Sequence, residues 1–438
     1  MGTKNKSIAL ILVALFLTSL VAFPFHSIKA DSTSDDWSMF RHDPSHTGVT
    51  DNIGPLKALE LWRFAEGHFD GYFVGSSAAV VNGIVYVGSN YNQAEHRGGN
   101  VYAFDAFNGG RIWNYSTDAP VYSSPAIRDN LLVIGSSDGI IYGLNSMTGA
   151  KMWSFSTEGR VYSSPAIVNG LVYVGSWDGN LYAINASNGN RVWSYQTGNS
   201  VLSSPAVNDN IVYVGSDDHN VYALDASTGL KIWNYTLGGP VDSSPAVVNG
   251  TVYVGSNWGA FDNVYALNAL TGNKIWSFKT FNGEEKGVTS SPAIADGRVF
   301  IGSQGGGLYA LNASTGVQLW NKESFFIVYS SPAVANGVVY INSAALNASN
   351  GETIWGFSTG NAINASPVVS NGVVYSASQD GYFYAIGKPI VVPSVISTQS
   401  IMIVLAAVLV ITAVSLLLYR RRHKLSFIKK DVEAKHGN

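Results

Sequence analysis

The stretch VYSSPAIVNGLVYVGSWDG at residues 161–179 contains two runs of β-branched, aromatic and small residues on either side of an Asn-Gly pair. Asn and Gly tolerate the positive φ angles of tight turns, so this pattern predicts a β-hairpin. The same pattern recurs as VYSSPAIRDNLLVIGSSDG at 121–139 and as VLSSPAVNDNIVYVGSD at 201–217. Repetition at a fixed period indicates a repeat fold, in which each unit buries its apolar face on its neighbour.

Tryptophan marks the period of this repeat. Eight of the 11 tryptophans share one register, at Trp62, Trp113, Trp153, Trp193, Trp233, Trp276, Trp320 and Trp355. Within one unit we expect four strands, at 161–168, 171–176, 180–186 and 191–196, separated by Asn-Gly or Asp-Gly turns. A four-stranded antiparallel sheet of about 40 residues, repeated along the chain, is the blade of a β-propeller.

The number of blades follows from the incomplete units at the two ends of the repeat region. Eight copies of the first two strands occur between Ser76 and Ser378, but the last copy ends at Gly387 without a tryptophan strand. The strand at 61–64 precedes any complete unit, so we expect it to pair with the last copy and close the ring. The predicted fold is an all-β, eight-bladed propeller of four-stranded antiparallel blades over residues 61–387. A linear β-solenoid is the alternative, but it would leave both half-units unpaired.

Blade 7 departs from the repeat. Residues 341–346 skip the usual Asp-Gly turn, so we expect its third strand to be truncated.

Three peptides share one repeat motif: YALDASTGLKIW at 222–233, YALNALTGNKIW at 265–276 and YALNASTGVQLW at 309–320. This motif resembles the tryptophan-docking repeat of the PQQ-type, or quinoprotein-like, β-propellers. The stretch WSMFRHDPSHTG at 37–48 resembles the lead-in segment that often precedes such repeats. The resemblance implies the propeller fold over most of the chain. It does not imply one activity, because the family contains dehydrogenases and also non-catalytic scaffolds, such as those of the outer-membrane assembly machinery. A WD40 propeller would carry Gly-His and Trp-Asp dipeptides at repeat positions. The repeats of this chain do not carry these dipeptides at such positions.

The segments outside the propeller predict export and a membrane anchor. Residues 1–30 have two lysines before an apolar run and indicate a signal peptide, with an uncleaved anchor helix as the alternative. A lead-in segment at 31–60 comes next, and a linker at 388–400 follows the propeller. Residues 401–419 are apolar, uncharged and long enough for a transmembrane helix, and the basic tail at 420–438 predicts a cytoplasmic end. We therefore expect a single-pass protein of the cell membrane with its propeller outside the cytoplasm.

Composition excludes several kinds of partner and site. The chain has no cysteine, so it forms no disulfide and no thiolate metal site. The two end segments contain 10 of the 26 Lys and Arg residues but only two of the 29 Asp and Glu residues, so the expected extracellular part is acidic, which disfavours binding to nucleic acid. We expect a monomer.

Positions that break the repeat are the candidates for function. One set follows the residue that opens each inner strand and is expected to surround one mouth of the channel. A second set lies in the loops after the second strands, which are long in blades 1 and 5, and contains tryptophans outside the repeat register. The alternative is that these side chains only pack at the rim or under the loops. The predicted ligand-binding residues are Tyr122, Tyr162, Trp177, Asp242, Trp258, Asp262 and Tyr329.

A membrane-tethered, PQQ-dependent dehydrogenase is the alternative function. The resemblance implies that such an enzyme would hold Ca²⁺ with carboxylate and amide oxygens and would use an Asp base. Many members also stack the cofactor on a vicinal disulfide, which this chain lacks. No spacing marks the acidic candidates as a cation site; they are Asp217, Asp218, Asp242 and Asp262.

The remaining signals favour a binding role. His42, Asp43 and His46 resemble a metal cluster, but we expect them to belong to a structural lead-in that packs under the ring. We predict no catalytic residue, no metal and no cofactor, with PQQ and Ca²⁺ only under the alternative. The predicted function is a cell-surface scaffold or binding module for envelope proteins or glycans. A purely structural envelope role differs from it only in having no specific ligand.

Asn-x-Ser/Thr sequons make the chain a potential glycoprotein if it is exported. Asn364 opens an inner strand and is not expected to accept a glycan. The candidate glycosylation sites are Asn114, Asn185, Asn234, Asn249, Asn312 and Asn347.

Overall fold

A computed structural model describes residues 36–65, 75–90, 98–258, 263–280, 287–323, 328–388 and 417. The chain divides into two units, Met1–Pro389 and Ile390–Asn438. The predicted signal peptide, linker, membrane helix and tail lie outside the described residues, except for residues 388 and 417. Within the described ranges, no helix has the length and apolar character needed to cross a membrane.

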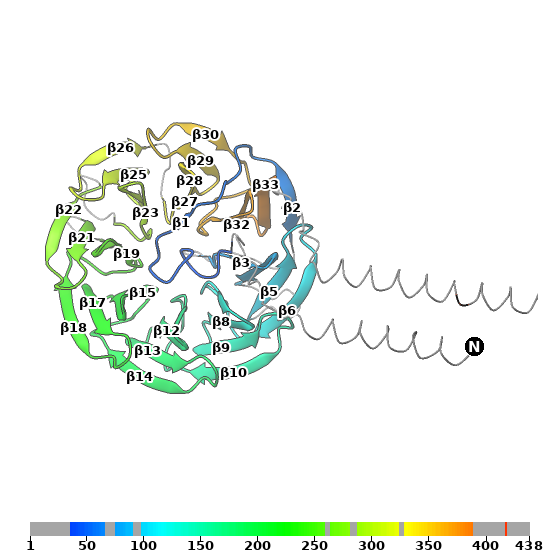
Figure 1. Cartoon of the computed structure of the whole chain (residues 1–438), viewed down its shortest axis with the longest axis horizontal. Helices are drawn as coiled ribbons and strands as arrows, with labels where there is room; N and C mark the ends of the chain where they lie inside the picture. The colour runs from blue at the N-terminus through cyan, green and yellow to red at the C-terminus, as the bar shows by residue number, and fades with distance from the viewer. Residues whose placement is uncertain are drawn as a thin grey trace, which may run out of the picture. The chain divides into compact units, whose positions relative to one another are not determined.

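The first unit is a ring of eight blades, as predicted. Within the described ranges, 33 strands form eight sheets, each built on four antiparallel strands, and one sheet carries β1 (Val49–Thr50) as a fifth, parallel strand. In seven sheets the four antiparallel strands follow chain order from the inside outward, and in the eighth the N-terminal β2 (Glu60–Phe64) takes the outer position. Figure 1 shows these sheets arranged around a common axis, with the fourth strands on the outside.

Every strand falls into one of four positions. The inner strands are β3 (Ala79–Val81), β7 (Ala126–Arg128), β11 (Ala166–Val168), β15 (Ala206–Asn208), β19 (Ala246–Val248), β23 (Ala293–Ala295), β27 (Ala333–Ala335) and β31 (Val368–Ser370). The second strands are β4 (Ile84–Gly88), β8 (Leu131–Gly135), β12 (Leu171–Gly175), β16 (Ile211–Gly215), β20 (Thr251–Gly255), β24 (Arg298–Ser303), β28 (Val338–Ile341) and β32 (Val373–Ala377). The third strands are β5 (Gly99–Asp105), β9 (Ile140–Asn145), β13 (Asn180–Asn185), β17 (Asn220–Asp225), β21 (Val264–Asn268), β25 (Gly307–Asn312), β29 (Ala344–Asn347) and β33 (Phe383–Gly387). The outer strands are β6 (Arg111–Thr117), β10 (Lys151–Ser156), β14 (Arg191–Gln196), β18 (Lys231–Thr236), β22 (Lys274–Phe278), β26 (Gln318–Lys322), β30 (Thr353–Gly356) and β2 (Glu60–Phe64), while β1 (Val49–Thr50) pairs with β27.

The ring closes through its N-terminal strand. β2 pairs antiparallel with β33, with Trp62 opposite Ala385 and Phe64 opposite Phe383. This pairing confirms the predicted closure and excludes the open solenoid. It also leaves blade 8 without a covalent turn between its third and fourth strands.

The eight register tryptophans dock each blade on the next. Each indole Nε1 donates a hydrogen bond to a backbone carbonyl at 2.8–3.1 Å. Seven of these carbonyls belong to the turn between the third and fourth strands of the following blade, as for Trp153 and Ala186. Blade 8 has no such turn, and Trp355 donates instead to Pro55 of the lead-in at 2.8 Å. The lead-in thus supplies the acceptor carbonyl that blade 8 lacks, because no turn connects its third and fourth strands.

The predicted inner strands are longer than the observed ones. Only Ala166–Val168 of the predicted strand 161–168 pairs as β-structure. Pro165 has no backbone N–H to donate to a neighbouring strand. The two serines before it form hydrogen bonds through their side-chain hydroxyls instead. The Ser163 hydroxyl accepts from the backbone N–H of Gly175 at 3.0 Å and donates to the carbonyl of Ser203 at 3.0 Å. Ser-Ser-Pro is therefore a junction between blades.

The lead-in lies in the axis of the ring, which corrects the prediction that it packs under the ring. Its carbonyls accept N–H groups at 2.6–3.0 Å from the inner strands of blades 1, 2, 4, 5, 6 and 7, as in the bond from Val207 to Pro44. Figure 1 shows this segment crossing the centre. The inner strand of a blade has an unpaired edge toward the axis, and the lead-in carbonyls accept hydrogen bonds from backbone N–H groups on that edge. Arg41, 2% exposed, donates to the carbonyls of Pro292 and Pro332.

Two smaller predictions concern blade 7 and the His/Asp cluster. The truncated third strand is confirmed, because β28 and β29 have four residues each and are joined by Asn342 and Ser343. His46 is buried, and burial lowers its pKa to about 4. Its Nδ1 lies 3.2 Å from the carbonyl of Pro245, so the neutral ring donates a hydrogen bond there. His46 therefore anchors the lead-in.

Candidate functional site

A cavity of about 560 Å³ lies where the segments before the inner strands converge on the axis. All eight blades contribute to its lining, and Phe40 of the lead-in lines it as well. Asp262 lies outside the described residues. The cavity brings together the other predicted ligand-binding residues: Tyr122, Tyr162, Trp177, Asp242, Trp258 and Tyr329.

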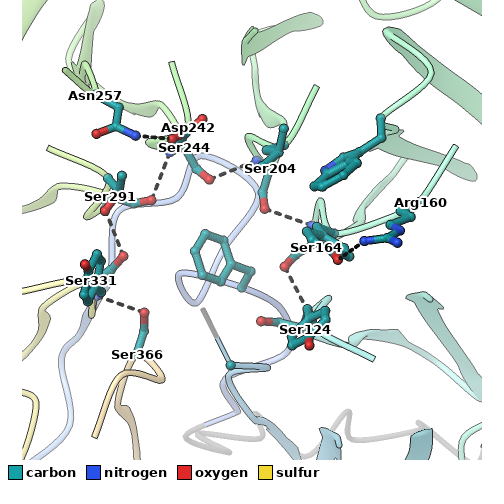
Figure 2. Close-up of a pocket in the computed structure, with 18 of the residues that line it drawn as sticks. Ser124, Arg160, Ser164, Ser204, Asp242, Ser244, Asn257, Ser291, Ser331 and Ser366 are labelled. Atoms are coloured by element: carbon teal, nitrogen blue, oxygen red, sulfur yellow. Dashed lines mark hydrogen bonds between the residues drawn. The ribbon is translucent and has the colours of Figure 1, made fainter. Parts of the chain in front are cut away.

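A ring of serine hydroxyls surrounds this cavity (Figure 2). The second serine of each Ser-Ser-Pro element accepts a hydrogen bond from the backbone N–H of its counterpart in the preceding blade, at 2.9–3.0 Å. Ser124 and Ser366 extend the same chain at either end. Because these bonds use each hydroxyl as an acceptor, its proton can be donated into the cavity. The cavity-lining members are Ser124, Ser164, Ser204, Ser244, Ser291, Ser331 and Ser366.

Three aromatic side chains from blades 2 and 3 form what we call the aromatic shelf: Tyr122, Tyr162 and Trp177. The ring centroids of Tyr122 and Tyr162 are 4.9 Å apart, as are those of Tyr162 and Trp177. Arg160 lies over the Trp177 ring at 5.3 Å and donates to the Tyr162 hydroxyl at 3.3 Å. Trp177 is nevertheless 39% exposed. The shelf therefore presents aromatic surface together with a cation.

Side chains from blades 5 and 6 form what we call the polar arc: Asp242, Asn257, Thr289 and Gln304. The Asn257 amide donates to Asp242 Oδ2 at 2.7 Å (Figure 2). The Gln304 amide lies 3.3 Å from Thr289 Oγ1 and 3.4 Å from Asn257 Oδ1, and donates to both. The arc is thus a connected chain of amide, hydroxyl and carboxylate groups.

A second carboxyl group lies next to the polar arc. Burial raises the pKa of Asp217 to about 8, and its hydrogen bond with Asp242 and the charge of that neighbour contribute. Asp217 therefore keeps its proton near neutral pH.

Trp258 occupies the rim of the cavity in a constrained backbone conformation. It is 63% exposed and has a φ of 41°, which is unusual for an aromatic residue. A Cβ on Gly239 would lie 1.8 Å from the Trp258 carbonyl oxygen, and one on Gly287 would lie 2.3 Å from its backbone nitrogen. Two glycines thus leave room for the backbone of Trp258, and strain of this kind is concentrated at functional sites.

Sequence reasoning missed several cavity residues. Arg160, Asn257 and Gln304 were not among the predicted ligand-binding residues. Asp217, which lies beside the cavity, was named as an acidic candidate without a partner. A sequence signal for Asp217, Asn257 and Gln304 was their common place in the repeat, directly after the Gly-Ser at the end of each second strand. That position holds Trp177, Asp217, Asn257 and Gln304 in blades 3 to 6.

The described part of the cavity does not fit Ca²⁺ as a quinoprotein would hold it. Ca²⁺ takes six or more oxygen ligands. Asp217 is protonated, and Asn257 turns its NH₂ toward Asp242 while its oxygen accepts from Trp258 N and Gln304. Across the described ranges, no group of three or more His, Asp or Glu side chains is placed to hold a metal.

The sequons differ in accessibility. Asn114, Asn234 and Asn249 are exposed, whereas Asn364 is 9% exposed. The other three are partly buried, and the Oδ1 of each accepts from the backbone two residues ahead; they are Asn185, Asn312 and Asn347.

Solved structures share this fold. BamB from Moraxella catarrhalis matches with a TM-score of 0.63 and 19% identity, covering 76% of this chain and 100% of that one. A quinohemoprotein alcohol dehydrogenase from Comamonas testosteroni matches at 0.67 and 16%, covering 84% and 83%. A europium-containing methanol dehydrogenase matches at 0.65 and 16%, covering 78% and 89%. At these identities the likeness concerns the fold alone.

The family assignment rests on the sequence. No curated protein matches the chain. The model of the PQQ_2 family, described as outer membrane protein assembly factor BamB, matches residues 57–203, 197–280 and 260–345, which together exceed half of the chain. With its docking tryptophans and closed ring of eight blades, the chain belongs to this PQQ_2, BamB-type family of β-propellers.

Proposed function

We propose that this protein is a non-catalytic binding and scaffold module. It is exported, held at the cell membrane by residues 401–419, and binds envelope proteins or glycans through the cavity face. One observation carries the proposal: residues that depart from the repeat in successive blades converge on a single cavity, while the lead-in occupies the axis behind it. The description of the family as an outer-membrane assembly factor supports a scaffold role.

A quinoprotein dehydrogenase is the second candidate. It is favoured by the fold that the chain shares with a quinohemoprotein alcohol dehydrogenase and a methanol dehydrogenase, and by the paired carboxyl groups beside the cavity. The poor fit of the described cavity to Ca²⁺ weighs against it.

A cofactor titration separates the two functions. The full-length chain would be titrated with PQQ, with and without Ca²⁺, while its tryptophan fluorescence is followed. Dye reduction would then be assayed with alcohols and sugars. We expect no cation-dependent quenching at micromolar PQQ and no turnover. Tight, Ca²⁺-dependent quenching accompanied by turnover would overturn the proposed function.

A further inference from the structure

We propose that the cavity binds a neutral, hydroxyl-rich ligand, namely the pyranose rings of an uncharged oligosaccharide. This inference rests on the proposed binding function and specifies its ligand class. Its evidence is the arrangement of aromatic, charged and hydrogen-bonding groups around the cavity.

The aromatic groups suit a ligand with apolar ring faces. Trp177 lies on the aromatic shelf and Trp258 at the rim, and both line the same cavity with indole surface exposed. A pyranose ring carries C–H groups on its faces and hydroxyls on its edges, so it can pack on an indole while its edges stay hydrogen-bonded. The close approach of Gly239 and Gly287 to the backbone of Trp258 fixes the point at the rim from which this indole extends.

The charges disfavour a strongly charged ligand. A cation on the aromatic shelf would meet the guanidinium of Arg160, which already lies over Trp177. An anion at the polar arc would meet the carboxylate of Asp242. Because a group of each sign lines the cavity, a neutral ligand avoids both repulsions.

The polar groups match hydroxyls, which both donate and accept. The serine ring offers O–H donors, Arg160 offers N–H donors, and Asp242 and Thr289 offer acceptor oxygens. The cavity volume of about 560 Å³ lies within the usual range of small-molecule sites, roughly 300–1,000 Å³.

The test compares neutral and charged trisaccharides, of which the acetylated and de-N-acetylated chitotrioses share one backbone. The full-length chain, in a detergent without a sugar headgroup, would be titrated calorimetrically with N-acetylated chitotriose, cellotriose and maltotriose. De-N-acetylated chitotriose serves as the cationic comparator and trigalacturonic acid as the anionic one. We expect saturable binding of at least one neutral trisaccharide and weaker binding of both charged ones.

Variants show whether binding occurs at the cavity. Trp258→Ala removes an exposed rim indole and should weaken binding at least about threefold. Asp242→Asn removes an acceptor without changing the volume and should also weaken it. Phe107→Ala is the matched control, because Phe107 is 69% exposed on the outer turn of blade 1 and does not line the cavity. Thermal unfolding monitored by circular dichroism verifies that each variant is folded.

The outcomes separate this inference from the proposed function. Three outcomes would each overturn the oligosaccharide assignment. No neutral trisaccharide binds, or a charged trisaccharide binds more tightly than the neutral ones. In the third, Trp258→Ala, Asp242→Asn and Phe107→Ala bind the neutral trisaccharide equally well. These results leave the non-catalytic function in place as long as PQQ produces no turnover. Turnover with PQQ would overturn both.

Discussion

The docking of each tryptophan on the next blade predicts a difference between two glycine substitutions in blade 3. Gly189 has a φ of 74° and lies under the indole of Trp153, whereas Gly170 has a φ of 77° and no described atom within 4 Å of an added Cβ. Alanine at either position incurs the same left-handed backbone cost of about 1–2 kcal/mol. Only Gly189→Ala also meets the tryptophan, so the difference between the two variants isolates the docking contact.

The size of that difference follows from the geometry. A Cβ on Gly189 would lie 2.8 Å from Trp153 Cε3 and 2.9 Å from Cδ2, inside the 3.4 Å at which ordinary van der Waals contact begins. Overpacking of this kind costs about 1–3 kcal/mol. Displacing the indole also weakens its 2.9 Å hydrogen bond to Ala186, worth about 1 kcal/mol. We expect Gly189→Ala to lower the free energy of unfolding by about 2–4 kcal/mol more than Gly170→Ala.

Urea unfolding followed by tryptophan fluorescence and circular dichroism measures both variants against the parent chain. In the Trp153→Leu background, Gly189→Ala should cost little more than Gly170→Ala costs in the parent chain, because the smaller side chain relieves the overlap. Equal midpoints for the two glycine variants would refute the reasoning, since the indole would then not be packed on the neighbouring blade.

Two further predictions concern buried charge. Arg41→Met should lower the free energy of unfolding by about 1–3 kcal/mol, because the carbonyls of Pro292 and Pro332 lose their donor. Arg63→Met, at an exposed ion pair, is the control and should leave the urea midpoint nearly unchanged. Equal urea midpoints for the two variants would contradict this prediction. The second concerns Asp217, whose pKa rises from 3.8 to about 8 on folding, so the native chain binds more protons than the unfolded chain between these values. Stability should therefore fall as pH rises through this window, and Asp217→Asn should flatten the dependence of the urea midpoint on pH; parallel curves would show that Asp217 is not the group responsible.

The strands and blades could be predicted because their signals are local. Asn169 and Gly170 indicate a hairpin by themselves, and the tryptophan register counts the units without any knowledge of their packing. The same local reading fails at Ser-Ser-Pro, where the small and β-branched residues favour a strand. The structure instead uses Ser163 and Ser164 to bond neighbouring blades, about 40 residues away in sequence.

The candidate site was predicted in part for the same reason. Tyr122, Tyr162 and Tyr329 occupy one repeat position, so their convergence follows from the closure of the ring. The contact between Asp217 and Asp242 joins different positions in adjacent blades and depends on how the blades are inclined to one another. No spacing in the sequence encodes that inclination.

By itself, the sequence determined the blade, the number of blades, the closing strand and the docking tryptophans, because each depends on a periodic pattern or on an unpaired half-unit. Only the tertiary structure decided that the lead-in lies in the axis, that Arg41 reaches carbonyls 251 and 291 residues away, and that aromatic and polar groups lie around one cavity. The physical reason is that the axis exists only after the ring has closed. Its contacts join residues that the repeat pattern does not relate.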